Sequence, residues 1–133
     1  MTGLAAAIRL RRRQLDVLAM TLAAEQATLH ALANDAQRLE RQSVAERHLA
    51  SVAPLASDAW FTHGARRLTA LADARTRSER TLADLREQVV QVRARLQLLD
   101  DAAAEARRAA DRRREAKAAA ALDDRIAAGW SRL

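Results

Sequence analysis

Apolar residues recur along the second half of the chain at alternating spacings of three and four. The clearest run consists of Leu82, Leu85, Val89, Val92, Leu96, Leu99, Ala103, Ala106 and Ala110. A spacing of about 3.5 residues keeps one stripe of a helix facing a partner helix, and no glycine or proline interrupts this run. The pattern therefore predicts a coiled-coil seam, which extends back through Leu68, Leu71, Arg75 and Ser78.

The first half of the chain carries a second seam with the same spacing. It consists of Leu4, Ile8, Arg11, Leu15, Leu18, Leu22, Glu25, Leu29, Leu32, Ala36, Leu39 and Ser43. Its two charged members, Arg11 and Glu25, lower the stability of a coiled coil but help to fix its register. With Thr2 as the N-cap, the pattern predicts a helix over residues 2–50.

One break separates the two seams, in the stretch SVAPLASD from Ser51 to Asp58. Pro54 disfavours helix at the preceding residue, and Ser57 can cap a new helix. The break predicts a turn over residues 51–57 and a second helix over residues 58–128. A short connection between long helices favours an antiparallel pair.

If the chain folds at about residue 55, residues whose numbers add to about 110 or 111 face each other, and the two seams coincide. The predicted pairs include Leu39 with Leu71, Leu29 with Leu82, Leu22 with Val89, Leu18 with Val92, Ile8 with Ala103 and Leu4 with Ala106. In this register Met1, at the start of the first helix, lies opposite about Ala109. The expected fold is all-α: one antiparallel two-helix coiled-coil hairpin over residues 1–133, with a C-terminal helix that projects beyond its partner.

Composition agrees with long helices and argues against a globular core. Half of the residues are hydrophobic, but alanine supplies many of them, and the only aromatic residues are Trp60, Phe61 and Trp130. The chain has no cysteine, and none of its apolar runs approaches the roughly 18–20 residues of a membrane span. The apolar residues near Met1 precede the basic cluster, the reverse of a secretory signal. These features predict a cytosolic protein.

The net charge of +6 favours an acidic partner, and arginine carries almost all of it. Basic residues concentrate at the predicted open end of the hairpin and along the start of the projecting helix, at Arg107, Arg108, Arg112, Arg113, Arg114 and Lys117. Two interpretations fit this cluster: a solvated helix surface, or a contact with an acidic surface of a protein or a nucleic acid. Acidic neighbours such as Asp111 and Glu115 dilute the charge that a nucleic acid would meet.

The sequence contains no recognisable catalytic arrangement. His30, His48 and His63 are scattered, and adjacent acids such as Asp100 and Asp101 point in different directions on a helix. The chain also has no phosphate-binding loop, nucleophile elbow or zinc spacing. We therefore expect no enzymatic activity, no metal and no cofactor.

The aromatic pair Trp60 and Phe61 lies beside Gly64, close to the predicted turn. As structural residues, the two rings would cap the end of the coiled coil by covering Leu49 and Val52. As functional residues, they would form a tip that anchors a partner, since aromatic side chains dominate binding hot spots.

Two stretches carry a resemblance to a known family. SDAWFTHGARRLTALADAR, from Ser57 to Arg75, is similar to the opening of the second helix in the flagellar export protein FliJ, and ALDDRIAAGW, from Ala121 to Trp130, resembles the terminal segment of that family. Length and the longer second helix agree as well. The chain thus resembles the FliJ family and its injectisome counterparts, the YscO-like stalk proteins, and the sequence does not separate the two systems.

The resemblance implies a non-catalytic stalk of a type III protein export apparatus, peripheral to the inner membrane at its cytosolic face. Such stalks insert their paired termini into the hexameric export ATPase, contact the cytoplasmic domain of the export gate protein, and in some members bind export chaperones. Here the implied ATPase-binding residues are Arg107, Arg108, Arg112, Arg113, Arg114, Lys117, Leu122 and Ile126. The implied gate-binding residues are Leu71 and Ala74, which lie on the early second helix.

Two alternatives remain open at the level of sequence. A basic helical protein associated with nucleic acid would bind DNA at physiological ionic strength, whereas the stalk is expected to form no stable nucleic-acid complex. A purely structural coiled coil would pair its seam with another chain, and light scattering would then report a doubled mass.

Overall fold

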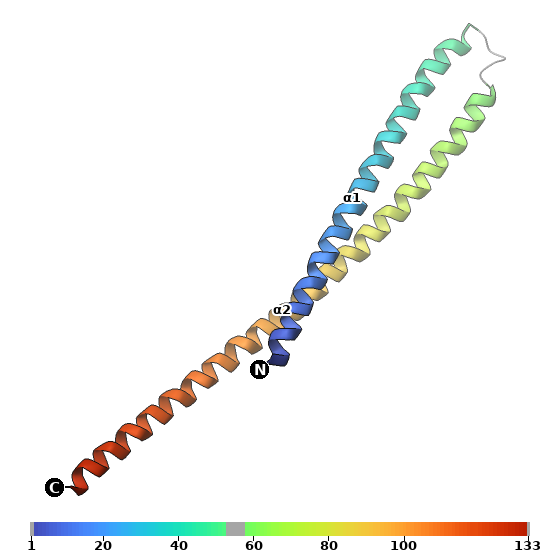
Figure 1. Cartoon of the computed structure of the whole chain (residues 1–133). Helices are drawn as coiled ribbons and strands as arrows, with labels where there is room; N and C mark the ends of the chain where they lie inside the picture. Colours follow the sequence, from blue (N-terminus) through green and yellow to red (C-terminus); the bar gives the residue numbers. More distant parts are fainter. Residues whose placement is uncertain (1, 53–57, 133) are drawn as a thin grey trace. The chain divides into compact units, whose positions relative to one another are not determined.

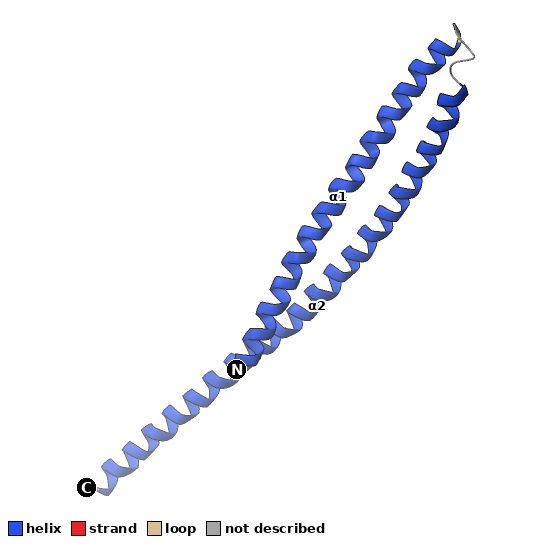
Figure 2. Ribbon diagram, turned by 45° about the vertical axis from the view of Figure 1, so that its right-hand side comes forward, coloured by secondary structure: helices blue, strands red, loops and turns tan. Residues whose placement is uncertain are grey.

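The computed structural model describes residues 2–52 and 58–132, which form two long helices. Helix α1 spans Thr2–Ala50 and helix α2 spans Asp58–Ser131, with 49 and 74 residues. Figure 2 shows the same all-helical content, which confirms the predicted all-α hairpin. The predicted break at Pro54 and the caps at Thr2 and Ser57 rest on residues or side chains outside the described set.

The helix ends agree closely with the sequence pattern. After Ala50 the backbone N–H of Val52 donates to the Leu49 carbonyl (3.0 Å), and the Ser51 hydroxyl donates to the His48 carbonyl (2.6 Å). Helix α2 continues to Ser131, a little beyond the predicted end at residue 128. Gly129 does not adopt a positive φ, so the helix passes through this glycine rather than ending there.

The chain divides into two compact units. The central unit is Gln14–Gln91, and the terminal unit combines Met1–Arg13 with Val92–Leu133. Within the central unit, α1 and α2 run side by side in opposite directions (Figure 1). Each unit therefore contains a segment of both helices, and each is described separately below.

The core of the central unit follows the two predicted seams. Leu39, Leu82 and Leu85 are buried, with exposed fractions of 7%, 3% and 8%, and the other leucines of the α1 seam in this unit are half-buried. At roughly 25 cal/mol per Å² of apolar surface removed from water, this single row of contacts supplies most of the driving force for the pair. The 3–4 alternation thus identifies the packed face correctly.

One predicted seam position is wrong. Arg75 is exposed, and its Nε donates to Glu79 Oε1 of the same helix at 3.0 Å. The neighbouring Ala74 is half-buried in its place. Burying a guanidinium group without a partner is costly, so the arginine turns to solvent and the small alanine faces α1.

The register near the turn also differs from the prediction. The hydroxyl of Ser78, which is 4% exposed, donates to Glu25 Oε1 at 2.6 Å, although the predicted register places Ser78 opposite Leu32. Leu39 lines a hollow with Gly64 and Leu68 rather than with its predicted partner Leu71. The pairing is therefore displaced by several residues in the central unit. A polar pair of this kind favours one register, because another offset would bury an unpaired carboxylate or hydroxyl.

Gly64 offers a test of helix packing near the turn. This glycine is buried and helical, without a positive φ, and an added Cβ would meet only the Trp60 ring, at 3.5 Å from Cζ3. That distance is an ordinary van der Waals contact. Because alanine is the better helix former, we expect Gly64→Ala to raise the free energy of unfolding by about 0.5–1 kcal/mol. Urea denaturation followed by circular dichroism measures the change; a loss of stability would show that Trp60 cannot accommodate the methyl group.

Candidate functional site

The last part of α2 is exposed along the whole length that the structure describes. Ala103, Ala106 and Ala110 are half-buried against α1, whereas every residue described from 111 to 132 is exposed. Figure 1 shows this orange-to-red end of α2 continuing past the N-terminus of α1, which belongs to the same unit. We call residues 111–132 the C-terminal arm. The structure thus confirms the predicted projecting helix.

All six basic residues of the predicted cluster are exposed, but only some are paired. Glu105 forms ion pairs with Arg108 (3.1 Å) and with Arg112 (3.0 Å), and Asp111 pairs with Arg114 (2.5 Å). Arg107, Arg113 and Lys117 form no ion pair with any described residue. These three cations can therefore meet acidic groups of a partner without first breaking an ion pair to a described residue.

The hydrogen bonds from Arg112 and then Arg108, together with their positive charges, hold the pKa of the Glu105 carboxyl below its ordinary value. A carboxyl whose pKa is lowered in the helix stabilises the helix above its unfolded pKa and loses that effect as the pH falls through its folded pKa. We therefore expect acidification from about pH 5 to about pH 2 to lower helicity more in the natural protein than in Glu105→Gln.

Circular dichroism over that pH range checks this expectation, with Glu87→Gln as the control at another exposed glutamate of α2. Concentrated salt should reduce the difference, because exposed ion pairs are screened. Identical pH profiles for Glu105→Gln and the natural protein would contradict it.

An apolar stripe occupies the end of the arm. Leu122, Ile126 and Trp130 follow each other at intervals of four, with exposed fractions of 56%, 50% and 72%. Side chains at this spacing lie on one face of a helix. Leu122 and Ile126 were expected here from the sequence, whereas Trp130 extends the stripe and was not predicted as a contact residue. The i, i+4, i+8 spacing is the signal that identifies it.

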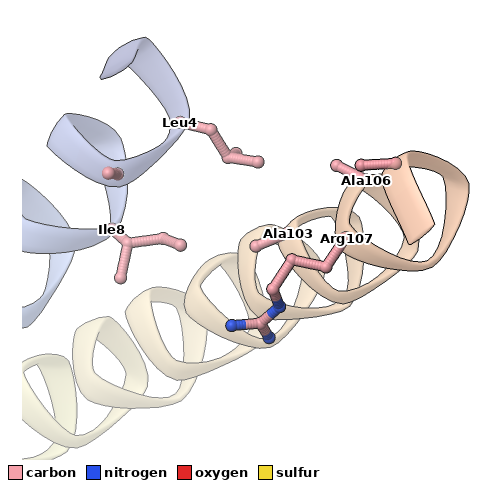
Figure 3. A pocket seen from close by; sticks show the side chains of 7 residues that line it. Leu4, Ile8, Ala103, Ala106 and Arg107 are labelled. Atoms are coloured by element: carbon pink, nitrogen blue, oxygen red, sulfur yellow. The ribbon is translucent and has the colours of Figure 1, made fainter. Parts of the chain in front are cut away.

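A hollow of about 320 Å³ lies within the terminal unit, between the start of α1 and α2. Leu4 and Ile8 form one wall, and Ala103, Ala106 and Ala110 form the other, with Arg107 at the edge (Figure 3). Both members of two predicted pairs, Leu4 with Ala106 and Ile8 with Ala103, line this hollow. The space remains because alanine methyl groups are too short to reach the leucine and isoleucine opposite.

The other predicted contact residues lie in the central unit. Leu71 and Ala74, the implied gate-binding residues, are half-buried on the α2 face that packs against α1. Part of each side chain is therefore committed to the seam, and the exposed remainder is what a partner could reach.

Trp60 and Phe61 pack edge to face, with ring centroids 5.4 Å apart, and both are half-buried. They line a hollow with Leu39, Ser43 and Leu68. They do not cover Leu49 and Val52, which are 58% and 81% exposed. The predicted cap over these two residues is therefore wrong: the Trp60 ring instead lies beside Gly64, where an added Cβ would be 3.5 Å from Cζ3.

The described residues hold no group of three or more histidine, cysteine, aspartate or glutamate side chains arranged for a metal ion. His30, His48 and His63 are each exposed. Within the described ranges, neither helix contains a stretch long and apolar enough to cross a membrane. The surfaces that remain are suited to binding: the basic arm with its apolar stripe, and the hollow at its base.

Comparisons with family models, with curated proteins and with solved structures found no match to this chain.

Proposed function

We propose that this chain is a non-catalytic stalk of a type III protein export apparatus, flagellar or injectisome, which inserts its termini into the hexameric export ATPase. The observation that carries the proposal is the C-terminal arm, in which α2 continues as a helix although every described residue from 111 to 132 is exposed. An isolated helix is only marginally stable in water, so such a length without packing suits a segment that a partner covers.

The chemistry of the arm suits the inside of a protein ring. Arg113 and Lys117, which pair with no described residue, can meet acidic side chains, while Leu122 and Ile126 supply apolar surface near the end. The arm would perform no bond chemistry. It would bind some conformations of the ring more tightly than others and so shift the populations through which the ATPase cycles.

A second contact would lie in the central unit. The proposal assigns Leu71 and Ala74 to the cytoplasmic domain of the export gate protein, with Trp60 and Phe61 as the aromatic tip near the turn, where export chaperones are further candidates. All four side chains are half-buried, so each retains some surface for a partner. A protein that contacts the ATPase through its arm and the export gate through its central unit would couple these two assemblies while remaining peripheral to the membrane.

Pull-down of the purified hexameric ATPase by the full chain tests the proposal. We expect the natural protein to retain the hexamer and the double variant Leu122→Asp, Ile126→Asp to lose at least about tenfold in affinity, since charge replaces the apolar surface. Leu98→Asp is the matched control, because Leu98 is 70% exposed and lies outside the arm. Absence of binding by the natural protein, or equal binding by all three, would contradict the proposal.

A further inference from the structure

We infer that the hollow at the base of the arm is a docking groove for an acidic amphipathic helix of a partner protein. The inference goes beyond the proposed function and does not depend on it, because it identifies the occupant from the shape and charge of the terminal unit alone. Three observations carry it: the walls of the hollow, the cations beside it, and the faces of α2 on which they lie.

The walls of the hollow are apolar and belong to two helices. Leu4 and Ile8 of α1 point toward Ala103 and Ala106 of α2, and the space between them measures about 320 Å³ (Figure 3). All four side chains are half-buried, so their apolar surface is not fully used by the contact between α1 and α2. A row of leucine-sized side chains from a third helix would fill this space, which is the helix-in-groove mode of recognition.

The charges beside the hollow select an acidic occupant. Arg107 lines it directly, and Arg113 and Lys117 follow Ala110 by three and seven residues on the same face of α2. None of these three cations has an ion pair with a described residue, and none of the described residues that line this hollow is acidic. Asp100, at the side where Arg12 lies 3.9 Å away, is already paired. Glutamates flanking a row of leucines would therefore complement the rim.

A second copy of the chain does not fit the groove. Its own acidic and apolar segment, around Asp124 and Ile126, is a possible insert by composition. However, Ile126 follows Ala106 by twenty residues, about five and a half turns, so the two side chains point to opposite sides of α2. Two copies therefore cannot lie side by side and each fill the groove of the other, and the net charge of +6 on each copy opposes their association.

A labelled groove tests the inference on the full chain. The sequence has no cysteine, so Ala5→Cys at the edge of the hollow accepts a single environment-sensitive dye, with Ala70→Cys as the control position in the central unit. The probe is a synthetic peptide of about three heptads with leucine on one face and glutamate elsewhere. We expect saturable binding at physiological salt that changes the dye at residue 5 but not at residue 70.

Two variants separate groove binding from charge attraction. Ala106→Leu fills the hollow with the side chain of a good helix former. The triple variant Arg107→Gln, Arg113→Gln, Lys117→Gln removes the three positive charges beside the hollow. We expect each of these two variants to weaken peptide binding at least about tenfold. The matched control, Arg77→Gln with Arg80→Gln and Arg86→Gln, removes the same charge from exposed sites in the central unit and should bind normally.

Several outcomes would overturn the inference. A peptide with serine in place of leucine that binds equally well would reduce the groove to a charged surface. Stronger binding of duplex DNA at the same site would identify a nucleic-acid contact, and a doubled mass in light scattering that Ala106→Leu abolishes would identify a second copy. Loss of ATPase binding in Leu122→Asp, Ile126→Asp with intact peptide binding would support both proposals independently.

Discussion

On the proposed function, reversing the charge of Arg112, Arg113 and Arg114 to glutamate is expected to reduce stimulation of the export ATPase by at least about tenfold. The change converts the densest basic stretch of the arm into an acidic one, so it replaces attraction to acidic groups of the ring with repulsion. Since all three side chains are exposed and glutamate is a good helix former, the helix itself should persist. The ion pairs lost with Glu105 and Asp111 are exposed and contribute little to stability.

The steady-state rate of the ATPase with and without this chain measures the effect, and circular dichroism verifies that helicity is unchanged. Arg77→Glu with Arg80→Glu and Arg86→Glu is the control, because these exposed residues carry the same charge change in the central unit. Equal losses in the two triple variants would point to net charge rather than to the arm. Full stimulation by the arm variant would argue against insertion of the arm.

The largest effect on stability is expected from Leu82→Ala, at about 2–4 kcal/mol of the free energy of unfolding. Leu82 is 3% exposed in the central unit, and its truncation would leave a cavity between two helices held by a single row of apolar contacts. A thin core has few neighbours that can relax into such a space, so both the transfer cost and the cavity cost apply.

Urea denaturation followed by circular dichroism checks this value. Val90→Ala is the control, because Val90 lies on the same helix and unit but is 64% exposed. Its truncation should change stability by no more than about 0.5 kcal/mol. If the two variants lose the same stability, the seam assigned to α2 is not the packed face.

The two helices could be predicted because few other structures are compatible with the spacing of the apolar residues. Apolar residues at spacings of three and four, with proline confined to one stretch, leave little choice but two long helices, and their observed ends fall within a few residues of the expected ones. The exposed arm could be predicted from the lengths of the two helices, because the second helix has more residues than the first can cover.

The register was harder to predict, because a seam that repeats can be matched at more than one offset. The same leucines also pair when Leu39 faces Leu68 and Leu22 faces Leu85, with no loss of apolar matches. What separates the offsets is the polar residues: Ser78 reaches Glu25 in the observed pairing. The prediction relied on apolar positions and on the assumed fold point near residue 55, so it had no means of using this pair.

The candidate site was only partly visible in the sequence. The basic residues of the arm could be named, but which of them are paired depends on side-chain geometry around Glu105 and Asp111. The hollow beside Leu4 depends on the distance between two helices. The alanines of this part of α2 do not reveal that distance from the sequence alone. The predicted positions of the Arg75 and Trp60 side chains were wrong for a related reason. Arg75 bonds to Glu79 and Trp60 lies beside Gly64, and a heptad pattern contains no information about such contacts within one helix.

The carboxylate of Glu105 has a mechanical consequence. It forms ion pairs with Arg108, in the stretch that α1 still covers, and with Arg112, in the first uncovered turn. These two ion pairs therefore span the point where α2 loses its contact with α1. A helix that loses its neighbour bends most easily at that point, and exposed ion pairs oppose the bending only weakly because water screens them. Thermal bending of α2 should therefore be greatest at the base of the arm, and a partner that covers the arm there would restrict it.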